Sequence, residues 1–220
     1  MTNYDLVIFD LDGTLLNTLD DLAASTNHAL AAHGFPARAT EQVRQAIGNG
    51  VRNLIRLSVP EGTPEAVQAQ VLADFKVHYT ANVSVHTRPY PGIPELLRAL
   101  RAEGVRVACN SNKVDNAVRL LCETHFPGLV DLALGEREGI PKKPAPDGVH
   151  LILRELGADA ARALYVGDSD TDLMTAKNAG ISGAWVSWGY RNRSELGDIE
   201  LPHAFDTVEA LRAYILAESV

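Results

Sequence analysis

Short apolar runs rich in β-branched residues alternate along the chain with stretches whose apolar positions recur every three or four residues. The stretches between the runs carry helix start and stop signals at Pro94, Gly104, Gly157, Gly180 and Thr207. The runs themselves fit buried strands and lie at residues 4–9, 105–109, 132–134, 163–166 and 184–187. Strands that alternate with helices predict an α/β protein with a parallel, Rossmann-like sheet covered by helices on both faces.

One long segment interrupts this alternation. Residues 18–84 show no strand pattern but contain four helical stretches. Gly34 ends the first stretch, and Thr63 and Pro64 are expected to cap and open the last one. The pattern therefore predicts an all-helical insert of residues 17–87 within an α/β core of residues 1–16 and 88–220.

The composition excludes several classes of protein. Of the 220 residues, 46% are hydrophobic and 22% are charged, which excludes a disordered chain. No apolar run approaches the roughly 20 residues that a membrane helix requires, and the first residues lack the features of a signal peptide. Only two cysteines are present, which fits a reducing compartment, so we expect a cytoplasmic protein.

The net charge restricts the partners. The chain has 28 acidic residues against 20 Lys and Arg, a formal charge of −8. Such a surface repels nucleic acids and anionic membranes, so neither is expected as a partner. It also repels a small anion, which would have to be held by a metal ion or by a local group of basic residues.

Acidic residues follow two of the predicted strands. Asp10 and Asp12 come at the end of the first strand, where open α/β sheets bind ligands, although Asp12-Gly13 alone also fits a surface turn. Asp168 ends the fourth strand, and Asp172 lies one helical turn further on, so both are expected on one side. Asp170 points elsewhere and fits a helix-capping acid.

Two further motifs lie at the same expected edge of the sheet. Ser111 and Asn112 follow the second strand, where a hydroxyl and free amides at a helix start would form an anion cradle; a simple Ser cap explains the pattern equally well. Lys143 stands directly before a proline and is restrained by it, whereas Lys142 fits a solvated loop. Carboxylates, a hydroxyl and a lysine at one edge suit Mg²⁺ and a phosphate group.

In their order and spacing these four motifs resemble the haloacid dehalogenase superfamily, in its phosphatase branch with a helical cap, and within it the bacterial phosphoglycolate phosphatases. The resemblance covers essentially the whole chain. It implies that the helical insert is a cap domain that selects the substrate, and that the protein hydrolyses a small phosphorylated metabolite, 2-phosphoglycolate, with Mg²⁺ as cofactor.

The resemblance also implies the role of each site residue. Asp10 would be the nucleophile that forms an aspartyl-phosphate, and Asp12 the general acid and then the general base. Ser111, Asn112 and Lys143 would bind the phosphoryl group. The Mg²⁺ ligands would be Asp10, the main-chain carbonyl of Asp12, and Asp168, with Asp172 in support.

The chain departs from the family pattern at two positions. Asn17 stands where an acid is usual, and Ser111 stands where close relatives commonly carry Thr. Neither change removes a catalytic group. In the cap, Gly50 and Arg52 lie in a predicted turn into a helix, and we expect Arg52 or the main-chain amides around Gly50 to bind the carboxylate of the substrate. A solvated Arg52 is the competing interpretation.

Other functions remain open from the sequence. The same chemistry serves phosphatases and phosphomutases for sugar phosphates, nucleotides or pyrophosphate. A non-enzymatic receiver module also combines acids, a hydroxyl and a lysine around Mg²⁺, but it is shorter and lacks a helical insert. The sequence leaves open whether the protein is a monomer or a homodimer.

Overall fold

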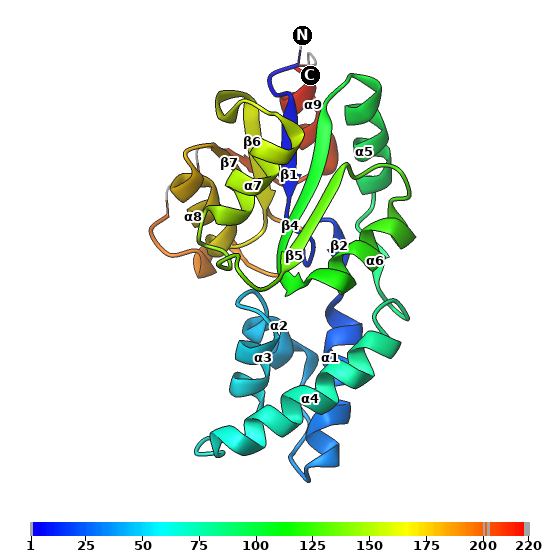
Figure 1. Ribbon diagram of the computed structural model, residues 1–220, viewed down its shortest axis with the longest axis vertical. Coiled ribbons are helices and arrows are strands. Elements are labelled where there is room, and N and C mark those ends of the chain that lie inside the picture. Colours follow the sequence, from blue (N-terminus) through cyan, green and yellow to red (C-terminus); the bar gives the residue numbers. More distant parts are fainter. Residues whose placement is uncertain (1, 200, 202, 218–220) are drawn as a thin grey trace. The chain divides into compact units, whose positions relative to one another are not determined.

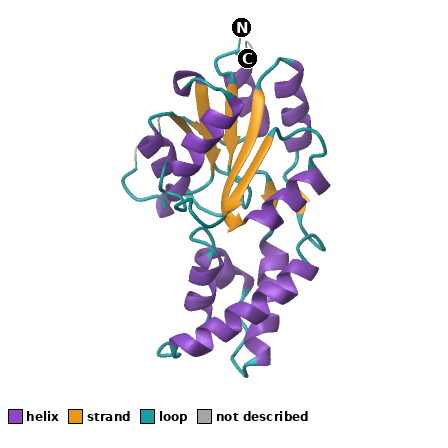
Figure 2. Ribbon diagram, viewed as in Figure 1, coloured by secondary structure: helices purple, strands orange, loops and turns teal. Residues whose placement is uncertain are grey.

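A six-stranded parallel sheet forms the centre of the α/β part of the protein (Figures 1 and 2). The computed structural model describes residues 2–199, 201 and 203–217. The strand order is β5-β4-β1-β6-β7-β8. The strands are β1 (Leu6–Phe9), β4 (Arg106–Val114), β5 (Leu132–Glu136), β6 (Ala163–Gly167), β7 (Ser182–Val186) and β8 (Ala204–Phe205). The α/β fold predicted from the alternating pattern is confirmed.

Helices cover both faces of this sheet. Leu6 and Ile8 of β1 point to the face covered by α7 and α8, where they join one buried apolar cluster with Val149 and Ile152. The other face is contacted by α5 and α6, and α9 lies against α5. These helices are α5 (Ile93–Ala102), α6 (Asp115–His125), α7 (Asp147–Leu156), α8 (Asp170–Ala179) and α9 (Val208–Leu216), with short 3₁₀ turns at Ala160–Arg162 and Arg193–Glu195. Because β1 is covered on both faces, all four of its residues are buried.

Several helix ends lie where the sequence signals predicted them. Gly157 and Gly180 adopt the left-handed conformation at the ends of α7 and α8. Thr207 caps α9 by accepting the main-chain N–H of Ala210 at 3.2 Å. A single residue therefore fixes where each of these helices ends or begins.

The chain divides into two compact units, one of residues 1–16 with 89–220 and the other of residues 17–88. The second unit consists of the four expected helices, and no strand longer than two residues is found in its described part. They are α1 (Leu19–Ala32), α2 (Thr40–Ala46), α3 (Val51–Ser58) and α4 (Glu65–Ala81). Two short strands, β2 (Leu16–Asn17) and β3 (Arg88–Pro89), pair where the chain passes from one unit to the other.

The start of α4 differs by one residue from the expectation. Pro64, and not Thr63, stands at the cap position, and the helix begins at Glu65. The Thr63 hydroxyl donates to the main-chain carbonyl of Pro60 at 2.6 Å, which closes the preceding turn. The hydroxyl is therefore not available to cap the helix.

Asp21 ties together the two ends of the helical unit. Its buried carboxylate accepts the main-chain N–H groups of His86 and Thr87 and the Thr87 hydroxyl, at 2.8–3.0 Å. These bonds fix the segment that leaves α4 against α1. A buried carboxylate that accepts several hydrogen bonds in this way is compensated for its loss of hydration.

Candidate active site

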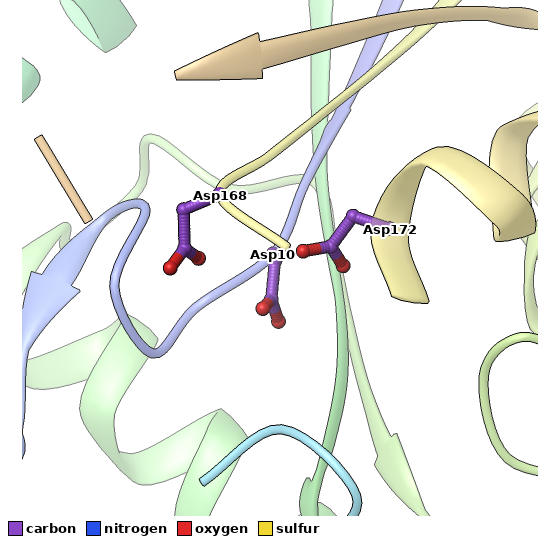
Figure 3. Close-up of side chains that lie close together, drawn as sticks. All are labelled: Asp10, Asp168 and Asp172. Carbon is purple, nitrogen blue, oxygen red and sulfur yellow. The ribbon is translucent and has the colours of Figure 1, made fainter. Parts of the chain in front are cut away.

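Two aspartates meet at the carboxyl edge of the sheet because β1 and β6 are neighbours. Phe9 lies opposite Val166 in the parallel register, so Asp10, which follows β1, lies close to Asp168, which follows β6. Asp172 comes from the first turn of α8 and points to the same place (Figure 3). All three side chains are buried, and one oxygen from each carboxylate lies within 4.8 Å of the others.

The start of α8 explains how Asp172 is fixed. Ser169 is the N-cap, and its hydroxyl donates to Asp172 Oδ2 at 2.6 Å, while its main-chain N–H donates to the same oxygen at 3.1 Å. Asp170 is the first residue of the helix and is exposed, so it points away from the site as predicted, but the cap that the sequence analysis assigned to it is formed by Ser169 with Asp172. The helix therefore directs one acid into the site and leaves the other in solvent.

Lys143 is the cation within this cluster. Its Nζ lies 2.8 Å from Asp10 Oδ1 and donates to Asp172 Oδ1 at 2.7 Å. The Asn112 side chain holds the main chain of Lys143 on both sides: its Oδ1 accepts the Lys143 N–H at 2.9 Å, and its Nδ2 donates to the Lys143 carbonyl at 3.1 Å. Asn112 thus positions Lys143.

The prediction that a helix begins directly after Ser111, with free amides forming an anion cradle there, is wrong. Strand β4 continues to Val114, and α6 begins only at Asp115. Ser111 therefore lies in the extended end of β4, buried, and its hydroxyl accepts the main-chain N–H of Lys113 at 3.3 Å. The extra strand length arises because residues beyond Asn110 pair with β5 again at Val114 after a break in register.

A second lysine, to which the sequence pattern assigned no role, lies at the same edge. Lys113 Nζ donates to both carboxylate oxygens of Asp12, at 2.8 and 3.0 Å. Ser111 and Lys113 are two residues apart in the last part of β4, and regular alternation along a strand would direct both side chains to one face. This two-residue spacing is the sequence feature that would have identified Lys113.

The loop after β7 holds Asp168 in place through its main chain. The N–H of Tyr190 donates to Asp168 Oδ2 at 2.7 Å, and the Thr14 hydroxyl donates to Oδ1 at 3.1 Å. A Cβ at Gly189 would lie only 2.3 Å from Asp168 Cβ, so only glycine fits there. These contacts were not foreseen, because a main-chain donor can come from almost any residue type.

The carboxylates of the site repel one another in a nearly dry environment. Burial, reinforced by the charge of Asp172, raises the pKa of Asp10 to about 8 although Lys143 opposes the change. Burial, again with Asp172, raises the pKa of Asp168 to about 7. Burial alone would lower the pKa of Lys143, but the Asp10 and Asp172 carboxylates raise it well above the usual value. Lys143 therefore stays charged.

The residues present fit a divalent cation. Asp10 Oδ1 is buried and, although near Lys143, accepts no hydrogen bond from any residue that the structure describes. Three carboxylates against one lysine leave an excess of negative charge. Carboxylate oxygens arranged in this way are the ligands that Mg²⁺ prefers.

We expect the stability of the protein in EDTA to fall as the pH rises from about 5 to about 8. The raised pKa of Asp10 means that the folded protein binds more protons than the unfolded chain in this range, so the free energy of unfolding decreases with pH. Such a group contributes up to about 1.4 kcal/mol per pH unit. Thermal denaturation of the wild type and of Asp10→Asn across this range measures the effect, which should be smaller in the variant. Equal slopes for the two proteins would contradict the expectation.

The two cap candidates lie in the helical unit. Gly50, with a φ of 82°, is the N-cap of α3, so the predicted turn into a helix is confirmed. Arg52 is an exposed residue of α3 and, with Arg56 and Gln68, lines a cavity of about 310 Å³ within that unit. Their contact with a substrate stays a prediction.

The sheet, the acidic cluster at its carboxyl edge and the buried lysine fit a hydrolase of phosphate esters. The chain belongs to the haloacid dehalogenase-like hydrolases, whose family model matches residues 7–186. The superfamily expected from the motifs is thereby confirmed, and the protein is a phosphatase. No helix in the described part of the chain is both long enough and apolar enough to cross a membrane.

The chain is similar to known phosphatases over nearly its whole length. It is 33% identical to the phosphoglycolate phosphatase of Aquifex aeolicus, covering 96% of this chain and 98% of that one, and 36% identical to that of Mesorhizobium japonicum, covering 86% and 85%. A crystal structure of a Lactobacillus delbrueckii subsp. bulgaricus protein, whose assignment as a phosphoglycolate phosphatase is provisional, has a TM-score of 0.92 at 34% identity, covering 99% and 100%. CbbY of Rhodobacter sphaeroides in complex with phosphate has a TM-score of 0.72 at 25% identity, covering 93% and 94%.

Proposed function

We propose that this phosphatase hydrolyses 2-phosphoglycolate to glycolate and phosphate, through an aspartyl-phosphate on Asp10 and with Mg²⁺ as cofactor. The observation that carries the proposal is the state of Asp10. Its buried Oδ1 lies beside Lys143 without a hydrogen bond, at the edge where parallel sheets bind ligands. With a divalent cation in addition to Lys143, the site favours the ionised form of Asp10, and a carboxylate needs no deprotonating base before it attacks.

The first half-reaction transfers the phosphoryl group to the protein. A carboxylate oxygen of Asp10 attacks phosphorus, and the bond between phosphorus and the glycolate oxygen breaks. Asp12 donates a proton to that oxygen, so glycolate leaves as an alcohol. Asp12 is half-buried, lies two residues after Asp10 and has its carboxylate held by Lys113, and we assign its carboxyl group to the leaving oxygen.

The second half-reaction regenerates Asp10. Asp12, now ionised, takes a proton from a water molecule whose oxygen attacks phosphorus. The bond between phosphorus and Asp10 breaks, and phosphate is released. One acid serves both steps because each step leaves Asp12 in the protonation state that the next one requires.

Lys143 and Ser111 are assigned to the transferring phosphoryl group. The Lys143 ammonium lies beside Asp10 and compensates the charge of the equatorial oxygens. Ser111 lies in the last part of β4, and Asn112 is assigned to phosphate binding through Lys143, which its side chain keeps in position.

The metal would be held by Asp10, Asp168 and the main-chain carbonyl of Asp12, with Asp172 in support. When bound, Mg²⁺ neutralises charge on the phosphoryl oxygens and aligns the phosphate with the attacking carboxylate. Thr14, Tyr190 and Gly189 keep Asp168 oriented for this role, and Ser169 does the same for Asp172.

The choice of 2-phosphoglycolate as substrate is supported by the names of the relatives that cover most of the chain. The helical unit is proposed as a cap that selects this substrate, with Gly50 and Arg52 as its candidate contacts. A panel of phosphomonoesters decides between this substrate and the alternatives of the same chemistry.

The test measures phosphate release from 2-phosphoglycolate, a sugar phosphate, a nucleotide and pyrophosphate, with Mg²⁺ and with EDTA. We expect kcat/KM for 2-phosphoglycolate to exceed the others by at least about tenfold, which one well-placed charged contact supplies, and EDTA to abolish turnover. A different preferred ester would refute the substrate. A phosphorylated protein that never releases phosphate would instead support a receiver-like acceptor.

A further inference from the structure

The core contains a second buried ion pair beside the one formed by Lys143. The Lys113 side chain is only 3% exposed and that of Asp12 only 13%, with Nζ on both carboxylate oxygens. A buried ion pair gains little stability over apolar residues of similar volume, because both charges lose their hydration. The cation at this position therefore calls for a functional explanation.

The charges at the edge of the sheet show why a substrate needs this lysine. Four carboxylates, of Asp10, Asp12, Asp168 and Asp172, face two buried lysines, and Lys143 is engaged by two of the carboxylates. A substrate such as 2-phosphoglycolate brings a phosphate and also a carboxylate. The phosphate has Lys143 as its partner. The carboxylate of the substrate would be repelled by the acids of the site unless a second cation received it.

The position of Lys113 matches the position of that carboxylate. Asp12 has to lie about 3 Å from the leaving oxygen to donate a proton to it, and Lys113 Nζ lies equally close to Asp12. In 2-phosphoglycolate the carboxylate is bonded to the carbon that carries the leaving oxygen. A cation that contacts Asp12 is therefore close enough to the leaving group to receive the substrate carboxylate.

We propose that Lys113 binds the carboxylate of the leaving group, and that this carboxylate displaces the Asp12 carboxylate from Lys113. This inference rests on the proposed function, because it assumes that Asp12 acts on the leaving oxygen. In the structure Lys113 holds the Asp12 carboxylate by both oxygens. The substrate carboxylate takes that place, and Asp12 turns to the leaving oxygen with a proton that it takes up from solvent. Lys113 thereby selects phosphorylated hydroxy acids over neutral phosphomonoesters.

The experiment compares 2-phosphoglycolate with ethyl phosphate, which has the same carbon chain without the carboxylate. Steady-state kinetics are measured for the wild type, Lys113→Met, Lys113→Arg and the control Lys142→Met. Lys142 lies in the loop next to Lys143 but is partly exposed and paired with Glu136. In Lys113→Met the ratio of kcat/KM between the two substrates should fall by about 10- to 100-fold, mainly through KM for 2-phosphoglycolate. Lys113→Arg should retain most of the preference, and Lys142→Met all of it.

Inhibition by non-hydrolysable analogues tests the same contact without turnover. The inhibition constant of 3-phosphonopropionate should rise about 10-fold or more in Lys113→Met, whereas that of propylphosphonate, which lacks the carboxylate, should change much less. Thermal denaturation verifies that the variant is folded; if it is not, the comparison is made with Lys113→Gln and Lys113→Arg, which retain a polar group at Asp12.

The outcomes separate this inference from the proposed function. If the wild type prefers 2-phosphoglycolate and Lys113→Met lowers kcat/KM equally for both substrates, Lys113 only positions Asp12. The inference is then overturned while the proposed function stands. If Arg52→Ala and not Lys113→Met removes the preference, the carboxylate is bound by the cap and the inference is again overturned. A wild type without preference for 2-phosphoglycolate refutes the proposed substrate and the role of Lys113 with it.

Discussion

Asp10→Asn is expected to abolish phosphate release, with kcat lower by about 10⁴-fold or more. The amide has nearly the shape of the carboxylate but is not a nucleophile towards phosphorus, and no other described carboxylate takes the place of Asp10 beside Lys143 at the end of β1. The substitution also removes one of three mutually repelling charges, so the fold is retained. Phosphate release under saturating Mg²⁺ and 2-phosphoglycolate measures the loss.

Two further measurements make the Asp10 result specific. Asp170→Asn, in which an exposed acid of α8 is neutralised, should change kcat by less than about threefold, as is usual for surface substitutions away from a site. Acid-quenched wild type should carry a phosphoryl group that mass spectrometry locates on Asp10. Substantial turnover by Asp10→Asn, or a phosphoryl group on another residue, would refute the covalent mechanism.

The fold was predictable because its main features repeat along the chain. Alternating strands and helices require a parallel sheet, and the carboxyl ends of parallel strands lie at one edge. That argument alone brings Asp10 and Asp168 together, and helical periodicity adds Asp172. The four helices of residues 17–88 followed equally from apolar spacing, whereas the start of α4 did not, because Thr63 uses its hydroxyl in a different bond.

The parts of the site that escaped prediction depend on exact strand length or on the main chain. The sequence placed the end of β4 before Ser111, so nothing defined the direction of Lys113 until the strand was seen to continue to Val114. The contact of the Tyr190 N–H with Asp168 involves no side chain of Tyr190. Asn112 was expected at the phosphate, but its amide matches both main-chain groups of Lys143, a pairing between residues 31 positions apart.

Lys143→Met is expected to lower both activity and stability, each by a large amount. Its Nζ contacts two carboxylates, at 2.8 and 2.7 Å, and is buried with them. In EDTA and without this lysine the three acids have no cation, and breaking a buried ion pair costs about 3–5 kcal/mol of unfolding free energy. The phosphoryl group also loses a preorganised positive charge, so kcat should fall by about 10²–10³-fold. Phosphate release and thermal denaturation measure the two effects, with Lys142→Met as the exposed control.

The double variant Lys143→Met/Asp172→Asn separates the two roles of this lysine. Asp172 contributes to the raised pKa of both Asp10 and Asp168, so neutralising it relieves much of the repulsion that Lys143→Met exposes, and the unfolding free energy should partly recover. The activity should not recover, because no other group replaces the ammonium at the phosphoryl oxygens. If the double variant regains both stability and turnover, Lys143 serves only to balance the acids. Recovery of stability alone, with the single variant Asp172→Asn still active, shows that the same buried charge also acts on the substrate.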